Sequence, residues 1–241
     1  MDLRLIIVLK TNLIAIGGFK GVGKDTSADM LRYLLNSPKI LHNYTCYKVF
    51  HKLFLRKWVK TSFAHPLKRT LAAMLNMKVE WFENRKFKEE LYIRFSDMHI
   101  TYNPNPDLIL KDNQFNRCLN KNDFNTIKDS YITMRQLMQC WGTSTMRAQY
   151  GDKIWILLTL INDKPTIISD LRFKVEAEEI RKRGGMLFYV ERVGYCGGQH
   201  ASEREVNDLV NNNKFDSIIC NYGTLTDLFY IIKKVILPTI K

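Results

Sequence analysis

A glycine-rich segment near the N-terminus, residues 18–26 (GFKGVGKDT), restricts the folds open to this chain. It fits the pattern G-x-x-x-x-G-K, between an apolar run at 12–17 and a stretch at 27–35 with apolar residues at helical spacing. Strand, glycine loop and helix in this order place backbone N–H groups and a helix N-terminus around an anion. The segment predicts a phosphate-binding loop rather than a plain connecting turn.

The loop also predicts the chemistry of its ligand. Lys24 is expected to reach the β- and γ-phosphates of a nucleotide. Asp25 replaces the usual Ser or Thr after the lysine, and Thr26 follows it. A carboxylate here can hold Mg²⁺ directly or through water, so both residues are candidate metal ligands. The expected nucleotide contacts are Gly21, Val22, Gly23, Lys24, Asp25 and Thr26.

The rest of the chain alternates apolar runs with helical patterns. Further strands are expected near 58–64, 166–171, 186–190 and 215–220, and helices from Pro66 and over 79–95, 133–150, 152–161, 175–182 and 225–236. This alternation predicts an α/β fold with a mostly parallel central sheet flanked by helices. We expect a single domain over 1–241, with an insertion or mobile lobe around 96–130, which is rich in Asn, Asp and Pro.

The composition limits the classes of binding partner but does not select one of them. Lys and Arg outnumber Asp and Glu by 37 to 24, a net charge of +13, which favours nucleic acid, an acidic membrane or phosphorylated ligands. The apolar stretch 3–9 is too short to span a bilayer. The cysteines are isolated and odd in number, which favours a reducing compartment over a disulfide framework: Cys46, Cys118, Cys140, Cys196 and Cys220.

Five ordered segments carry a resemblance to a known family. Besides the loop they are 63–68 (FAHPLK), 135–147 with RQLMQ and GT, 170–176 with DLRF, and 200–203 (HASE). Together they resemble the deoxynucleoside monophosphate kinases of tailed phages and other large DNA viruses, a branch of the P-loop kinases. The resemblance implies a P-loop kinase fold with an inserted or lid region.

The resemblance also implies a reaction. The enzyme would be a phosphotransferase that uses ATP and Mg²⁺ to convert deoxynucleoside monophosphates to diphosphates, supporting DNA synthesis in a host cytoplasm if the protein is viral. No obligatory nucleic acid and no membrane is implied, and a homodimer stays open. Dephospho-coenzyme A and phosphomevalonate kinases share the loop and remain alternatives, followed by a DNA-binding P-loop ATPase.

Cations are the main catalytic equipment that such a transfer needs, because negative charge spreads over the moving phosphoryl group. By resemblance, the catalytic candidates are Lys24, Arg147 and Arg172. Arg192 is a candidate lid arginine over ATP, and Asn221 either contacts the adenine or caps the backbone.

The acceptor side is assigned in the same way. The substrate-binding candidates are Lys20, Lys68, Arg69, Arg135, Gln136, Gln139, Thr143, Trp155 and Asp170. Lys68 or Arg69 would grip the monophosphate, Arg135 can fork onto a phosphate, and Gln139 can read a base edge. Trp155 either stacks on the ligand or packs in the core.

Two assignments keep a structural alternative. Asp170 either orients a water of the metal or a substrate group, or it caps the following helix. His200 and Glu203 have no evident chemical role, since Ser202 and Glu205 form the pattern of a capping box.

Overall fold

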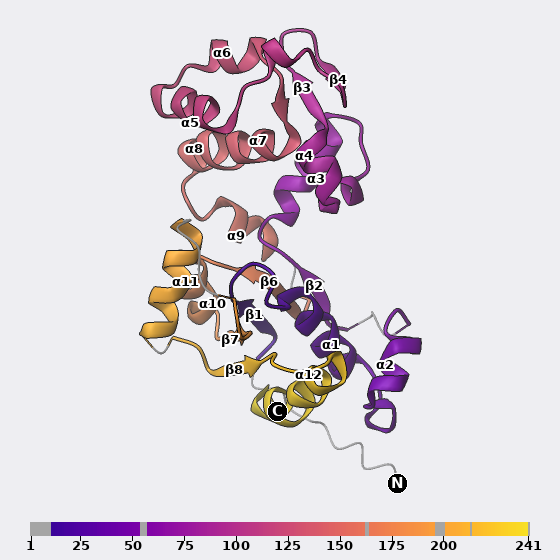
Figure 1. The fold of residues 1–241 in the computed structure, drawn as a ribbon. Coiled ribbons are helices and arrows are strands. Elements are labelled where there is room, and N and C mark those ends of the chain that lie inside the picture. Colours follow the sequence, from indigo (N-terminus) through magenta and orange to yellow (C-terminus); the bar gives the residue numbers. More distant parts are fainter. Residues whose placement is uncertain (1–10, 54–56, 162–163, 196–200, 213, 241) are drawn as a thin grey trace. The chain divides into compact units, whose positions relative to one another are not determined.

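The computed structural model describes residues 11–53, 57–161, 164–195, 201–212 and 214–240, without the side chains of 201–204. The chain forms two compact units (Figure 1): unit 1 comprises 1–63 and 159–241, and unit 2 comprises 64–158. The region 96–130 lies inside unit 2, and its description as an insertion or mobile lobe stays a prediction.

Unit 1 is built on a five-stranded parallel sheet with the order β2-β6-β1-β7-β8. Its strands are β1 (Leu13–Gly17), β2 (Val59–Thr61), β6 (Thr166–Leu171), β7 (Met186–Glu191) and β8 (Ser217–Cys220). All five residues of β1 are buried, because helices cover both faces of the sheet. The expected α/β architecture with a mostly parallel sheet is confirmed, and the strands nearly match their predicted ranges.

Each strand of unit 1 is followed by one or more helices; those before β8 connect parallel strands, and those after it close the chain. The helices of unit 1 are α1 (Lys24–Asn36), α2 (Tyr44–Phe50), α10 (Lys174–Lys182), α11 (Ala201–Asn211), α12 (Leu225–Ile231) and α13 (Leu237–Ile240), with a 3-10 turn at Lys39–Leu41 and a π-helical segment at Ile232–Ile236. Helices α1 and α12 lie on one face and α10 on the other (Figure 1), so that Ile14, Leu31 and Phe229 join one core.

Unit 2 has a separate core and a small antiparallel sheet, β4-β3-β5. Its elements are α3 (His65–Met74), α4 (Arg85–Glu90), β3 (Tyr92–Arg94), β4 (His99–Thr101), α5 (Asp112–Lys121), α6 (Phe124–Asp129), β5 (Ile132–Thr133), α7 (Met134–Gln139), α8 (Ala148–Tyr150) and α9 (Ile154–Thr159). Val79–Glu83 and Pro106–Leu108 are 3-10 turns, and Cys140–Arg147 is π-helical.

The predicted helix over 79–95 is wrong in its extent. Asn84 has extended backbone angles, and its Oδ1 accepts from the backbone N–H of Phe87 (3.2 Å), so it starts the short helix α4. Residues 92–94 then form strand β3, because they pair with both β4 and β5. Charge periodicity indicated a helix, and strand pairing decided against it.

The predicted helical run from Thr133 to about residue 150 is confirmed. The Thr133 hydroxyl accepts from the N–H of Gln136 (3.1 Å), and helix α7, the π-helical segment and α8 follow without a break. Gly142 lies in the π-helical segment, where an added Cβ would come within 3.0 Å of the Leu67 side chain. This run carries four of the nine acceptor-side candidates: Arg135, Gln136, Gln139 and Thr143.

Candidate phosphate-binding site

The glycine loop between β1 and α1 has the backbone that a phosphate cradle needs. Gly18, Gly21 and Gly23 all have positive φ (144°, 86° and 100°), a region that other residues rarely adopt. At Gly18 an added Cβ would lie 2.6 Å from the carbonyl oxygen of Val190. The loop is therefore fixed in shape by unit 1 itself.

Lys24 is the first residue of α1 and is 8% exposed. Its Nζ donates to the carbonyl oxygens of Gly18 (2.7 Å) and Phe19 (2.6 Å) within the loop. Carbonyl dipoles thus hold the ammonium group over the glycine loop. This position suits a lysine that exchanges carbonyl contacts for phosphate contacts.

Asn221 follows β8 and holds the loop from the other side. Its Nδ2 donates to the carbonyl oxygen of Val22 (2.8 Å), and its backbone N–H donates to the carbonyl oxygen of Glu191 (2.8 Å). The residue is 6% exposed, and an added Cβ at Gly23 would lie 2.6 Å from Nδ2. The amide predicted to contact adenine is engaged with the phosphate loop, which is closer to the capping alternative.

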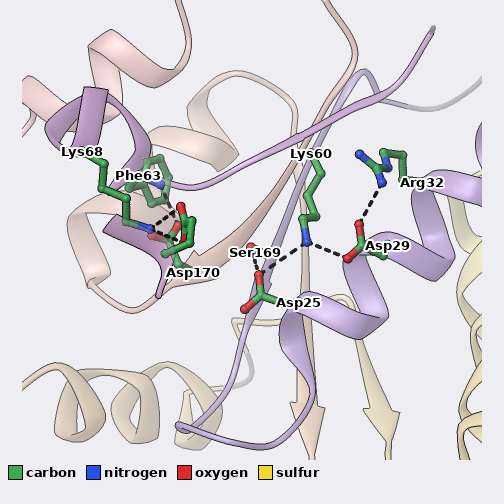
Figure 2. A network of polar contacts seen from close by, with 9 residues as sticks. Asp25, Asp29, Arg32, Lys60, Phe63, Lys68, Ser169 and Asp170 are labelled. Atoms are coloured by element: carbon green, nitrogen blue, oxygen red, sulfur yellow. Dashed lines mark hydrogen bonds and ion pairs between the residues drawn. The ribbon is translucent and has the colours of Figure 1, made fainter. Parts of the chain in front are cut away.

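Asp25 lies in a polar network between α1 and the ends of β2 and β6 (Figure 2). Its Oδ1 accepts from the Ser169 hydroxyl (2.7 Å) and lies 3.7 Å from Lys60 Nζ. Lys60 in turn donates to Asp29 (2.7 Å), which also pairs with Arg32 (3.0 Å). The network fixes the Asp25 carboxylate through one oxygen.

The donors present fit a magnesium ion bound together with a nucleotide. The Asp25 side chain is 77% exposed, and Thr26 lies half-buried in the same helical turn. Among the described residues no group of three or more His, Cys, Asp or Glu side chains could hold a metal. Mg²⁺ in kinases needs only one or two protein ligands besides water and phosphate oxygens, so a single carboxylate with hydroxyl neighbours suffices.

The end of β6 places two further candidates of unit 1, Asp170 and Arg172. Asp170 Oδ1 accepts from the backbone N–H of Phe63 (2.7 Å), which ties β6 to the segment after β2 (Figure 2). Helix α10 is capped instead by Glu176, whose Oε2 accepts from the N–H groups of Arg172 (2.8 Å) and Phe173 (3.0 Å). The Arg172 side chain is exposed at the carboxyl edge of the sheet, where α/β folds bind ligands.

Arg192 and Tyr195 lie next to the phosphate loop. The Arg192 guanidinium lies over the Tyr195 ring, 5.2 Å from its centroid. An added Cβ at Gly21 would come within 2.7 Å of the same ring, so Tyr195 contacts the loop. Lys20 is exposed at the tip of this loop. His200 lies outside the described residues, as do the side chains of Ser202 and Glu203.

In unit 2, several acceptor-side candidates have carboxylate partners. Lys68 Nζ donates to both oxygens of Glu83 (2.7 and 2.8 Å), and Arg135 Nη2 donates to Glu89 Oε1 (2.8 Å). Arg69 is exposed on α3. Burial lowers the pKa of His65, and the positive charge of Arg69 lowers it further, so this imidazole is neutral at pH 7.

The remaining candidates follow along the run from Thr133. Gln139 and Thr143 are exposed, and Arg147 is half-buried. Gln139 Nε2 donates to Asn116 Oδ1 at 3.3 Å, a contact a ligand can replace. These residues keep the exposure that a binding role requires.

Gln136 and Trp155 are corrections to the predicted substrate-binding set. Gln136 is buried: its Oε1 accepts from the N–H of Thr133 (2.8 Å), and its Nε2 donates to Leu110 O (3.0 Å) and Asp112 Oδ1 (2.9 Å). Trp155 is 3% exposed, and its Nε1 donates to the carbonyl oxygen of Gly142 (2.9 Å). Both side chains are used inside unit 2 and offer no free face to a ligand.

Three polar residues of these networks were absent from the predictions. Ser169 lies in the buried strand β6, where a hydroxyl is unusual enough to serve as a signal, whereas Lys60 lies in the short, half-buried strand β2. Lys88 lies in the charged segment that the sequence assigned to a plain amphipathic helix. No local spacing joins these residues to the loop, because their partners are far away in sequence.

Comparisons with known proteins place the chain in a family. A family model described as deoxynucleotide monophosphate kinase matches residues 105–232, more than half of the chain. No curated protein matches. Among solved structures, a dephospho-CoA kinase from Campylobacter jejuni is 14% identical, with a TM-score of 0.36 over 95% of this chain and 97% of that chain. The phosphate loop and the family match confirm the resemblance inferred from the sequence: the chain belongs to the deoxynucleotide monophosphate kinase family and is a phosphotransferase acting on nucleotides.

Proposed function

We propose that this kinase transfers the γ-phosphoryl group of ATP to the phosphate of a deoxynucleoside monophosphate, giving ADP and the deoxynucleoside diphosphate. The observation that carries the proposal is the family match, whose range includes helix α7 with Arg135 and the strands β6 to β8. In a cell the reaction would supply precursors for DNA synthesis. No helix among the described residues has the length and apolar character needed to cross a membrane.

On the donor side, the glycine loop and Lys24 would bind the phosphates of ATP. The backbone N–H groups of 21–26 would surround the β-phosphate, and Lys24 would move from the carbonyls of Gly18 and Phe19 to the β- and γ-phosphates. Arg172 and Arg192 are the cations near the same edge of the sheet that would neutralise the charge of the transferring group. Such an arrangement stabilises negative charge as it develops, and this effect usually contributes most to the rate of such transfers.

Asp25 and Thr26 would hold the magnesium ion of the ATP complex. The ion would screen the phosphate charges and orient their oxygens. The Ser169 hydroxyl and Lys60 both contact Oδ1 of Asp25, so they fix the direction of the carboxylate. Asp170, whose Oδ1 accepts from the backbone N–H of Phe63, is the candidate that would orient a substrate group.

On the acceptor side, unit 2 supplies the candidate contacts. Lys68, Arg69 and Arg135 would bind the monophosphate, and Arg147 would act on the transferring group, with Lys20 of the loop between donor and acceptor phosphates. Gln139 and Thr143 are exposed hydrogen-bonding groups that could read the base. Base selection therefore rests on Gln139 and Thr143, without Gln136 and Trp155.

An ADP-release assay over a panel of acceptors tests the proposal. The panel contains deoxynucleoside and ribonucleoside monophosphates, dephospho-coenzyme A and phosphomevalonate, with Lys24→Ala as the inactive control. We expect ADP release with deoxynucleotides alone. Release with either of the last two acceptors would replace the proposal by the corresponding alternative, and ATP hydrolysis stimulated only by DNA would favour a DNA-binding ATPase.

A further inference from the structure

Three cations of unit 2 come from three different helices: Lys68 on α3, Lys88 on α4 and Arg135 on α7. We call them the cation cluster. Helix α4 packs against α7 and against the 3-10 turn 79–83, which in turn packs against α3. The packing of unit 2 thus gathers three side chains that lie up to 67 positions apart in the sequence.

The members of the cation cluster differ in their carboxylate partners. Lys68 is bound by Glu83, and Arg135 by Glu89. In the part of the chain that the structure describes, Lys88 makes no ion pair within 4.0 Å, although it is half-buried and adjacent to Glu89. Partial burial of an ammonium group without a counterion is unfavourable. The position of Lys88 therefore does not stabilise the fold.

Electrostatics supports this reading of Lys88. Burial lowers the pKa of its ammonium group, and the positive charges of Lys68 and Arg135 lower it further. Glu83 and Glu89 act in the opposite direction without cancelling the effect. The position therefore lacks negative charge, which a bound anion would supply.

The charge that is missing matches a phosphate monoester. Glu89 is shared with Arg85 (3.0 Å), so Lys68, Lys88, Arg135 and Arg85 together face two carboxylates. A phosphate monoester carries about −1.5 to −2 charges at pH 7. His65, at the start of α3, adds no charge at this pH, because burial and Arg69 lower its pKa.

We propose that Lys88 is a phosphate-binding residue of the acceptor site and acts with Lys68 and Arg135 on the phosphate of the monophosphate substrate. The inference rests on the proposed function and adds a residue to it. Glu83 and Glu89 are the internal counterions of the cluster, and the incoming phosphate competes with them for Lys68 and Arg135. No described carboxylate competes in this way for Lys88, which contacts the phosphate first.

Steady-state kinetics with three variants tests the role of Lys88. Lys88→Met removes the charge and keeps the length, Lys88→Arg restores a cation, and Lys86→Met is the matched control, since Lys86 lies on the same helix and pairs with Glu90 (3.8 Å). We expect Lys88→Met to raise the KM for the monophosphate roughly tenfold, with the KM for ATP unchanged. Lys88→Arg should recover most of the loss, and Lys86→Met should match wild type.

Two kinetic results would overturn the inference. One is an equal KM for the monophosphate in Lys88→Met and Lys86→Met. The other is a parallel rise in the KM for ATP, because a merely structural role would affect both substrates.

A binding experiment separates this inference from the proposed function. Inorganic phosphate is titrated by calorimetry into the full chain carrying Lys24→Ala, so that the phosphate loop contributes little. Phosphate binding that weakens with Lys88→Met and not with Lys86→Met supports the site even if no deoxynucleotide is phosphorylated. No phosphate binding, or equal binding in both variants, rejects the site even if the kinase activity is confirmed.

Discussion

Lys24 of the glycine loop and two acceptor-side cations of unit 2 donate to different kinds of group. In unit 1, Lys24 is buried and donates to the carbonyl oxygens of Gly18 and Phe19. In unit 2, Lys68 and Arg135 are bound by the carboxylates of Glu83 and Glu89. A carbonyl carries only a partial charge, whereas a carboxylate carries a full one and competes strongly with a phosphate.

The glycine loop is thus a preformed site, whereas two cations of the cation cluster are neutralised by carboxylates of the same unit. The glycine loop keeps its shape, and Lys24 already lies over it among the loop carbonyls. The cation cluster needs its carboxylates to release Lys68 and Arg135. Changes in the loop should therefore have larger effects than changes among the carboxylates, and the two should differ in sign.

The largest effect is expected for Lys24→Ala. In the proposed reaction the lysine charge would stabilise the transferring phosphoryl group, and loss of such a stabilising group lowers turnover by about 10²–10³ or more. The ADP-release assay measures this loss, and circular dichroism should show an unchanged fold. Turnover near the wild-type value would remove the loop from the catalytic site.

The shape of the loop is tested by Gly23→Ala against Gly184→Ala. Both glycines have positive φ (100° and 70°), so alanine costs roughly 1–2 kcal/mol of backbone strain in either place. Only at Gly23 would the added Cβ meet a neighbour, Nδ2 of Asn221 at 2.6 Å. We expect both variants to lose thermal stability, Gly23→Ala more than Gly184→Ala, and the KM for ATP to rise in Gly23→Ala alone.

Asn221→Ala asks whether this residue acts through the loop or on the base. Its Nδ2 donates to Val22 in the loop, a hydrogen bond with a net value of about 1 kcal/mol. We expect the KM for ATP and for GTP to rise by the same factor, several-fold in each case. A change in the preference between ATP and GTP would instead support the predicted contact with adenine.

Glu83→Gln should improve acceptor binding. The change removes the carboxylate that binds Lys68. Lys68 is buried, but Glu83 is 59% exposed, and a pair that is open to solvent on one side is worth about 1 kcal/mol or less. We expect the KM for the monophosphate to fall about two- to fivefold, since 1.4 kcal/mol corresponds to tenfold. Glu90→Gln, which removes only the partner of exposed Lys86, is the control. A higher KM in Glu83→Gln would show that Glu83 orients Lys68 for binding.

Unit 1 could be predicted closely because its signals are local. Strand β1, the glycine loop and helix α1 are contiguous in sequence, and the buried strands read as apolar runs. The start of α7 in unit 2 is predictable for the same reason, because Thr133 and Gln136 form a capping box within four residues. Such features are fixed by neighbours along the chain.

Unit 2 is harder to predict from the sequence because its contacts join residues that are distant along the chain. The segment 92–94 became a strand through pairing with 99–101 and 132–133, which charge periodicity does not reveal. Trp155 could have stacked on a ligand by its type alone, and burial decided against it. Lys88 resembles any surface lysine in sequence, and what distinguishes it is half-burial beside other cations without a carboxylate partner among the described residues.

The smallest effect expected is on stability, and its sign is unusual. The pKa of Lys88 is lower in the folded protein, so the folded state binds fewer protons than the unfolded one, and stability rises with pH through that pKa. Lys88→Met should therefore be slightly more stable than wild type at pH 7, by about 1–2 °C in Tm. Wild type should regain the difference as the pH is raised toward about 10, the ordinary range of lysine. Thermal unfolding at both pH values measures this, with Lys86→Met as the control that should gain nothing. A Lys88→Met protein that is less stable at pH 7 would mean that Lys88 supports the fold of unit 2 and that its charge is not held there for a ligand.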